Sequence, residues 1–349
     1  MKLLNAFVVA IAASAMLSTL VQAGEETREE RLLSSKEIAR LIDAGMHDRI
    51  TENNVELVSA MLNPKIGDSL NKTLNLDLIA EELFEGAKPS IDGNCYDSRF
   101  DLKKCEMTAG EAAGKGAYAK LAFASDKSKT SLRYAKRSDA VDLPKPVKLS
   151  DAEAYKGALS LAVETFGVSE VEIPRAPAKS KNPYPVKTVN LATSKGKGVS
   201  SDIPVQKLVT IQRGLYVEKL GWIPGPGRLS VSFNSDGLNA AALRSWADMS
   251  EYGHDIDPRK AKSRAELVEE LTTLFQKEGV AKLDSARSLL AVSLPTGAES
   301  PIPVLRVFAS AQPSELSEKE QANVVSSAGV VFEIPLVASD DAMSSSDDN

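Results

Sequence analysis

One stretch, residues 203–246, constrains the fold more than any other part of the chain, because its apolar residues alternate as they do in a β-strand. In residues 228–233 every second position is apolar. A period of two puts Leu229, Val231 and Phe233 on one face of a strand, and the arginine and serines between them on the other. The pattern therefore predicts a strand with one buried face.

Turn residues bound this strand on both sides. Residues 223–227, Ile-Pro-Gly-Pro-Gly, precede it, and residues 234–237, Asn-Ser-Asp-Gly, follow it. Proline lacks a backbone donor and glycine adopts positive φ easily, so both segments predict turns or loops. Because residues 208–217 are rich in β-branched and aromatic side chains, we expect three antiparallel strands, the last ending near Trp246.

Helical spacing dominates other parts of the chain. Residues 31–86 space their apolar side chains for several short helices, and residues 265–275 are amphipathic. Ser150 and Glu153 form a capping-box pattern, which opens a helix that Gly167 ends. We therefore expect an α+β fold, with a helical N-terminal region followed by one or two modules in which a helix packs on an antiparallel sheet.

The expected domains follow from these patterns and from the segments between them. Residues 126–149 are charged and contain Pro-Lys-Pro, which is typical of a linker. Residues 339–349 are rich in Ser and Asp, which predicts disorder. The expected organisation is a signal peptide (1–23), a mostly helical region with a disulfide loop (24–125), a linker (126–149), an α+β module with an antiparallel sheet (150–250), a second helix-plus-strands module or an extension of the same sheet (251–338), and a disordered acidic tail (339–349).

Residues 1–23 predict export. Lys2 is the only charged residue before Glu25, and an apolar run leads to the small-x-small cleavage pattern that ends at Ala23. The run is short for a membrane span, so cleavage after Ala23 is the favoured interpretation and an uncleaved signal anchor is the alternative. We therefore expect a periplasmic or secreted protein without a transmembrane anchor, in which the sequon at Asn71 matters only in a eukaryote. The chain has 42 basic and 48 acidic residues, a net charge of −6, which opposes specific binding of nucleic acid.

Two cysteines, Cys95 and Cys105, lie close together in the sequence. In an exported protein such a pair predicts a disulfide, which in the chain-entropy model contributes about 2–3 kcal/mol across so short a loop. The spacing differs from the C-x-x-C of redox enzymes, and no His or further Cys is near enough to suggest zinc. Against the calcium-binding EF-hand pattern, Lys103 stands where the final Glu should be. We expect neither a metal nor a cofactor.

Residues 175–201 form the most basic run of the chain and contain no acidic residue. Such runs are usually solvated surface loops or hairpins. A long basic loop is also a candidate patch for an anionic polymer such as lipopolysaccharide, a sulfated glycan or nucleic acid. The candidate anion-binding residues are Lys179, Lys181, Lys187, Lys195 and Lys197.

Histidine is scarce, because the chain has His47 and His254 alone, and this opposes several classes of enzyme. Neither residue stands in the H-E-x-x-H pattern of zinc peptidases, and no G-x-S-x-G nucleophile elbow or phosphate-binding glycine loop occurs. The densest polar cluster is Tyr252, His254, Asp255 and Asp257, a combination that ordinary surface loops also carry. We assign no catalytic residue.

The helix after Ser150 and the strands up to Trp246 resemble the PepSY and fungalysin-propeptide type of module. The resemblance implies a helix packed on a small antiparallel sheet, and an association with binding or restraining secreted peptidases. The chain differs from the family pattern by its Pro-Gly-Pro-Gly insertion and by the basic connection that precedes it. The matching residues are Gly214, Val217, Gly221 or Gly225, Leu229, Val231, Phe233, Asp236, Gly237 and Trp246.

Three functions stay open from the sequence. The first is a non-catalytic exported protein that binds a peptide, a protein, or an anionic envelope or glycan component, with a peptidase-modulating role implied by the resemblance. The second is a secreted hydrolase that uses paired carboxylates, since Asp and Glu are abundant. The third is a structural component of a surface or matrix. We favour the first, because the catalytic patterns named above do not occur.

Overall fold

The structure is a computed structural model that describes most of the chain between residues 34 and 338. The described residues are 34–46, 49–70, 74–85, 90–92, 103–110, 118–125, 128–137, 145–174, 184–195, 199–277, 283–296, 298, 300–311 and 328–338. The expected signal peptide and acidic tail lie outside them, as do His47, Asn71 and Cys95.

Helices and strands are distributed along the whole described chain. The helices are α1 (Ser35–Met46), α2 (Val55–Met61), α4 (Leu76–Leu83), α5 (Asp151–Ser160), the π-helical turn η3 (Leu161–Thr165), the 3₁₀ turns η4 (Glu170–Glu172) and η5 (Pro258–Lys260), and α6 (Arg264–Lys277). The strands are β1 (Ser90–Asp92), β2 (Lys103–Gly110), β3 (Tyr118–Ser125), β4 (Lys129–Arg137), β5 (Val186–Lys195), β6 (Val199–Val217), β7 (Gly221–Asn234), β8 (Gly237–Ala247), β9 (Leu283–Ser293), β10 (Ile302–Ala311) and β11 (Ala328–Pro335).

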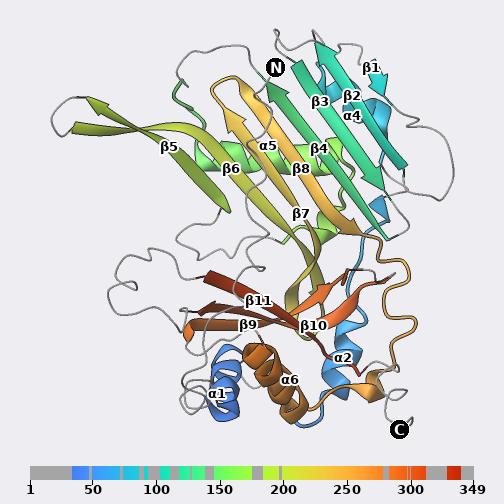
Figure 1. Ribbon diagram of the computed structural model, residues 1–349. Helices are drawn as coiled ribbons and strands as arrows, with labels where there is room; N and C mark the ends of the chain where they lie inside the picture. Colours follow the sequence, from blue (N-terminus) through green and yellow to red (C-terminus); the bar gives the residue numbers. More distant parts are fainter. Residues whose placement is uncertain are drawn as a thin grey trace, which may run out of the picture.

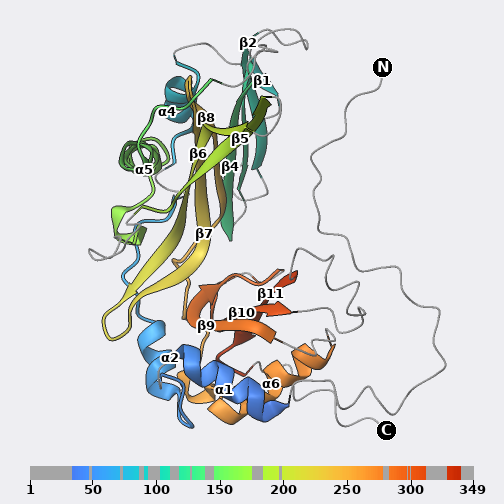
Figure 2. The same ribbon diagram turned by 90° about the vertical axis from the view of Figure 1, so that its left-hand side faces the viewer.

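An eight-stranded antiparallel sheet, the large sheet, forms the upper part of the molecule in Figure 1, in the order β1-β2-β3-β4-β8-β7-β6-β5. Two meanders meet where β4 pairs with β8. Helices α4 and α5 lie on the same face of this sheet (Figure 2). The first core lies between helices and sheet, and it includes Ile79 and Leu83 of α4, Ala154 and Ala158 of α5, and Leu121, Leu132, Leu229, Val231 and Leu243 of the strands.

A three-stranded antiparallel sheet in the order β11-β10-β9, the small sheet, forms the lower part of the molecule. Helices α1 and α6 lie against one face of it (Figure 2). The second core fills this layer, and the rings of Phe275 on α6 and Phe332 on β11 meet edge to face with 4.8 Å between their centroids. The small sheet lies below the large sheet in Figure 2, on the side opposite α4 and α5.

The hairpin of β6 and β7 is long enough to belong to both cores. Its outer ends contribute Val209 and Leu229 to the first core, and its turn end contributes Leu215 and Ile223 to the second. Between the two cores lies a buried ion pair in which Nη2 of Arg213 donates to the carboxylate of Glu172 at 2.5 Å. Strand β6 and the turn after α5 are therefore joined by charge as well as by packing.

The expected fold class is wrong, because the described chain is mostly antiparallel β-sheet and its helices are short. Helices do occur between residues 35 and 83, but β1, β2 and β3 follow them in the region expected to be helical. Strand β4 lies where a linker was expected. The apolar residues of β3 and β4 alternate and are buried in the first core. Alanines between them favour helix in isolation, and the neighbouring strands override that preference.

The three strands predicted for residues 203–246 are confirmed as β6, β7 and β8, with one difference. The Pro-Gly-Pro-Gly segment lies inside β7 and does not form a loop. A register shift after Gln212 accommodates it, and the side-chain amide of Gln212 donates to the carbonyl groups of Gly225 and Gly227, both at 2.8 Å. The Gln212 side chain thus satisfies two carbonyl groups of this segment where the register shift interrupts the backbone pairing.

Candidate functional site: an arginine face on the large sheet

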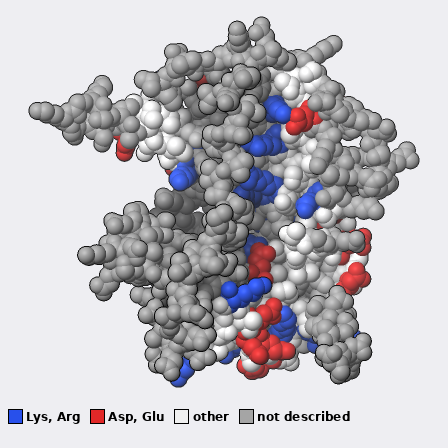
Figure 3. Space-filling view, viewed as in Figure 1, with Lys and Arg blue, Asp and Glu red and all other residues white. Residues whose placement is uncertain are grey.

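Within the described chain, no helix covers the face of the large sheet opposite α4 and α5 (Figure 2). Because side chains alternate along a strand, Leu132 and Leu243 are buried in the first core, whereas Arg133 and Arg244 point the other way. Arg228 of β7 lies on this open face as well, and all three arginines are exposed. We call this surface the arginine face. In Figure 3 it shows as Lys and Arg gathered over the central strands, while Asp and Glu gather mostly over the lower part.

Strand pairing brings the three arginines together from distant parts of the sequence. Arg228 and Arg244 are direct partners across β7 and β8. Arg133 is paired with Ala242, two residues before Arg244 on β8, so it lies diagonally from Arg244. Neighbouring strands are about 4.8 Å apart and diagonal positions about 7–8 Å. Arg244 is thus a neighbour of both other arginines, whereas Arg133 and Arg228 lie two strands apart, so an extended anionic ligand can contact all three.

The side chains of these arginines have no hydrogen-bonding or ion-pair partner among the described residues. Like charges directly opposite each other in a sheet are destabilising, and guanidinium groups remain charged in proteins. The pairing of Arg228 with Arg244 is therefore unfavourable to the fold by itself. An anionic ligand would offset that repulsion.

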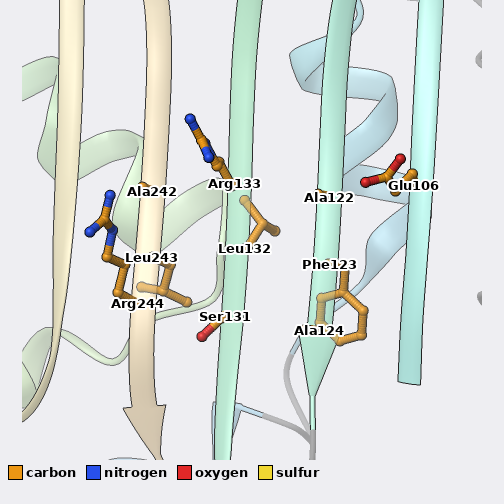
Figure 4. A pocket seen from close by; sticks show the side chains of 10 residues that line it. All are labelled: Glu106, Ala122, Phe123, Ala124, Ser131, Leu132, Arg133, Ala242, Leu243 and Arg244. Atoms are coloured by element: carbon orange, nitrogen blue, oxygen red, sulfur yellow. The ribbon is translucent and has the colours of Figure 1, made fainter. Parts of the chain in front are cut away.

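An open trough of about 520 Å³ lies beside Arg133 and Arg244. Figure 4 views it from the open side, with Arg133 and Arg244 on one side, Glu106 on the other, and helices behind the strands. Glu106 forms an ion pair with Lys120 at 2.6 Å, and both side chains are about half exposed. The trough is lined by Glu106, Ala122, Phe123, Ala124, Ser131, Leu132, Arg133, Ala242, Leu243 and Arg244.

Small side chains make the floor of this trough. Ala122 lies between Glu106 and Arg133 in strand register, since it is paired with Glu106 on β2 and with Arg133 on β4. The side chains of Leu132 and Leu243 are buried in the first core, so these residues expose backbone on the trough side. A ligand can therefore approach the strands closely between two charged walls.

Irregular backbone fixes the strands next to the arginines. Ser245 has a φ of 50°, and its N–H donates to Oγ of Ser131 at 3.0 Å, where the register of β4 and β8 shifts. Such a bulge changes the direction of the following side chain. Trp246 accordingly is buried, with its ring centroid 5.1 Å from the guanidinium of Arg213. The buried ion pair thus lies directly behind the end of the arginine face.

The lysines predicted to bind anions lie elsewhere or outside the described residues. Lys187 is exposed on β5, the edge strand two places beyond the strand of Arg228. Lys195 is the last residue of β5, and its side chain is not among those described. Lys179, Lys181 and Lys197 lie outside the described residues. An anion-binding role for these lysines stays a prediction.

The polar cluster predicted around residue 254 is divided among separate contacts. Tyr252 is buried, its hydroxyl donates to a backbone carbonyl of α2 at 3.0 Å, and burial raises the pKa of Tyr252. His254 is exposed, with Nδ1 2.9 Å from the carboxylate of Glu251, and Asp255 is exposed too. Hydrogen bonds from the side chain and backbone of the next arginine lower the pKa of Asp257, which caps η5. These contacts support a structured turn and do not join the four side chains in one site.

The disulfide expected between Cys95 and Cys105 stays a prediction, because only one of the two cysteines is described. Cys105 lies in β2, where it is paired with Phe123 of β3. Cys95 lies outside the described residues, and no disulfide joins any two described residues.

Neither a metal site nor a membrane span is found in the part of the chain that the structure describes. No group of three or more His, Cys, Asp and Glu side chains there is placed to hold a metal ion, and no helix there is long and apolar enough to cross a membrane. Comparison with protein-family models, curated proteins and solved structures found no match. The resemblance to PepSY-type modules therefore stays a prediction.

Sequence reasoning missed the arginine face, although part of the signal is present. The alternation in residues 228–233 already places Arg228 on the polar side of a strand. Arg244 joins it across the β7–β8 hairpin, but Arg133 joins only through the pairing of β4 with β8, two strands separated by about a hundred residues that include α5. No local pattern predicts that pairing.

Proposed function

We propose that this chain is a non-catalytic exported protein that binds an anionic envelope or glycan component on its arginine face. One observation carries the proposal: Arg133, Arg228 and Arg244 converge on an open surface without acidic partners among the described residues. Guanidinium groups bind phosphate, sulfate and carboxylate through paired hydrogen bonds. Their chemistry suits recognition, since a guanidinium holds its protons and does not act readily as an acid or base.

The rest of the chain is consistent with such a role. The apolar N-terminal segment predicts export, and an exported protein meets the anionic polymers of a cell envelope or matrix. The net charge of −6 would oppose binding to a polyanion if charges were evenly distributed. A local basic face overcomes this opposition at short range, because charges farther away than about 8–10 Å are screened at physiological salt.

The experiment measures binding of purified protein to two labelled polyanions, inorganic polyphosphate and dextran sulfate, by fluorescence anisotropy. The test variant combines Arg133→Gln, Arg228→Gln and Arg244→Gln. Each exposed charge contact contributes about 0.5–1 kcal/mol, so loss of three should weaken binding roughly 10- to 100-fold. Added salt should weaken wild-type binding more than binding by the variant.

A matched control removes the same amount of charge elsewhere. It combines Lys145→Gln, Lys148→Gln and Lys156→Gln, which are exposed and lie on α5 or on the segment leading into it. This variant should bind both polyanions within about two-fold of wild type, allowing for the long-range effect of net charge. Equal losses in the two triple variants, or no binding by the wild-type protein, would refute the proposal.

A further inference from the structure

We infer that the ligand of the arginine face is an acidic sugar, with its anionic group on the arginines and its hydroxyl groups directed at Glu106. The inference rests on the proposed function and specifies the ligand. It comes from the trough beside the arginines, where opposite charges stand on opposite walls and do not reach each other. Arg133 and Glu106 are both paired with Ala122, so they are two strands or about 9–10 Å apart.

The two sides of the trough can bind different chemical groups of one ligand. Arg133 and Arg244 supply donors with positive charge, which suit phosphate, sulfate or carboxylate. Glu106 supplies a carboxylate that accepts from Lys120 and has further lone pairs to offer. Because the Glu106 carboxylate only accepts hydrogen bonds, a plain polyanion would leave that wall unused, and a neutral polyol would leave the arginines unpaired. A sugar that carries an anionic group satisfies both walls.

The floor suits the ring of such a sugar. Ala122, Ala124 and Ala242 expose single methyl groups, which can contact the C–H face of a sugar ring without excluding it. Oγ of Ser131 accepts the backbone N–H of Ser245, which leaves its own O–H able to donate to a ligand oxygen. The trough thus offers an apolar base, a hydroxyl donor and two charged walls.

The test compares a heparin-derived tetrasaccharide with tripolyphosphate, which has anionic charge but no sugar, by titration calorimetry on the full-length protein. The variants are Glu106→Gln, which removes the acceptor charge, and Ala122→Leu, which fills the floor. Ala135→Leu is the matched control, because Ala135 lies on the same face but does not line the trough.

We expect the two ligands to respond differently to Glu106→Gln. Tetrasaccharide affinity should fall about ten-fold, the size expected for a charge-assisted hydrogen bond, whereas tripolyphosphate affinity should not fall, because tripolyphosphate has no hydroxyl group to donate to Glu106. Ala122→Leu should weaken tetrasaccharide binding by ten-fold or more and change tripolyphosphate binding little. Ala135→Leu should leave both affinities unchanged.

Three results would overturn the inference: tetrasaccharide affinity unaffected by Glu106→Gln and Ala122→Leu, both ligands responding alike, or tripolyphosphate binding without tetrasaccharide binding. In each case loss of binding in the triple arginine variant would still support the proposed function. If that variant binds as wild type does, the proposed function fails first and the sugar assignment fails with it.

Discussion

Replacing Glu172 by Gln should destabilise the protein by about 3–5 kcal/mol, because the change leaves a buried guanidinium without its counter-charge. The side chains of Glu172 and Arg213 are only 1% and 3% exposed. Arg213 donates to one carboxylate oxygen at 2.5 Å, and the indole N–H of Trp246 donates to the other at 3.2 Å. Burial lowers the pKa of Arg213, and the charge of Glu172 opposes that effect.

The size of this destabilisation follows from the few other hydrogen-bond partners of the Arg213 guanidinium. Its Nη1 donates to the carbonyl groups of Ala247 at 2.6 Å and of Pro226 at 3.4 Å, and its Nε has no hydrogen-bond partner among the described residues. Glutamine keeps the volume and one acceptor oxygen, so most of the loss is the loss of charge. A decrease of about 3–5 kcal/mol is a large share of the 5–15 kcal/mol that stabilises a typical domain. The variant should therefore unfold at a markedly lower urea concentration.

Urea unfolding followed by tryptophan fluorescence measures the effect directly. Glu170→Gln is the control, since Glu170 belongs to the same turn and is exposed, and it should change stability by less than about 0.5 kcal/mol. The double variant Glu172→Leu with Arg213→Leu should be less destabilised than Glu172→Gln, because it removes both buried charges. A Glu172→Gln protein within about 1 kcal/mol of wild type would refute this account of the junction between the two cores.

Three further predictions concern other parts of the chain. The hydrogen-bonded guanidinium of Arg264 lowers the pKa of Asp43, so this contact between α1 and α6 stabilises the fold above the unfolded-state pKa and is lost as pH falls through the folded value. Asp43→Asn should accordingly cost at most about 1 kcal/mol in urea unfolding at pH 7, with a smaller difference from wild type at pH 3. Gly227→Ala should destabilise by about 1–3 kcal/mol, since φ is 127° there and an added Cβ would lie 3.0 Å from the backbone of Trp246; Gly237→Ala, at 97° but with open space, should cost less. Intact mass spectrometry of the exported protein should show a gain of two hydrogens on reduction, and free thiols in the unreduced sample would contradict the disulfide.

The sequence predicts the local elements better than it predicts the sheet. Ser150 and Glu153 do form a capping box at the start of α5, because a cap depends on residues three positions apart. The alternation in residues 228–233 likewise predicts β7 and its buried face. Both signals are contained within a few residues, so they can be read without knowing the fold.

The errors come from contacts between distant segments. Residues 129–137 look like a charged linker, yet pairing with β8 makes them a central strand of the large sheet. The Pro-Gly-Pro-Gly segment looks like a loop, yet it pairs with β6 beyond a register shift, and the Gln212 amide hydrogen-bonds to two of its carbonyl groups. The arginine face depends on the same long-range pairing. A count of charges along the chain favoured the lysine run of residues 175–201 instead.

The most direct test of the arginine face is protection of individual arginines from labelling with phenylglyoxal, an arginine-selective reagent, in the presence of dextran sulfate. Peptide mass spectrometry reports each site separately and requires no variant. Arg133, Arg228 and Arg244 should be labelled readily in free protein, because they are exposed, and should be protected by the polyanion. Arg49, exposed between α1 and α2, should be labelled equally with and without it. Protection of Arg49 to the same extent, or unchanged labelling of the three arginines at saturating dextran sulfate, would contradict the assignment.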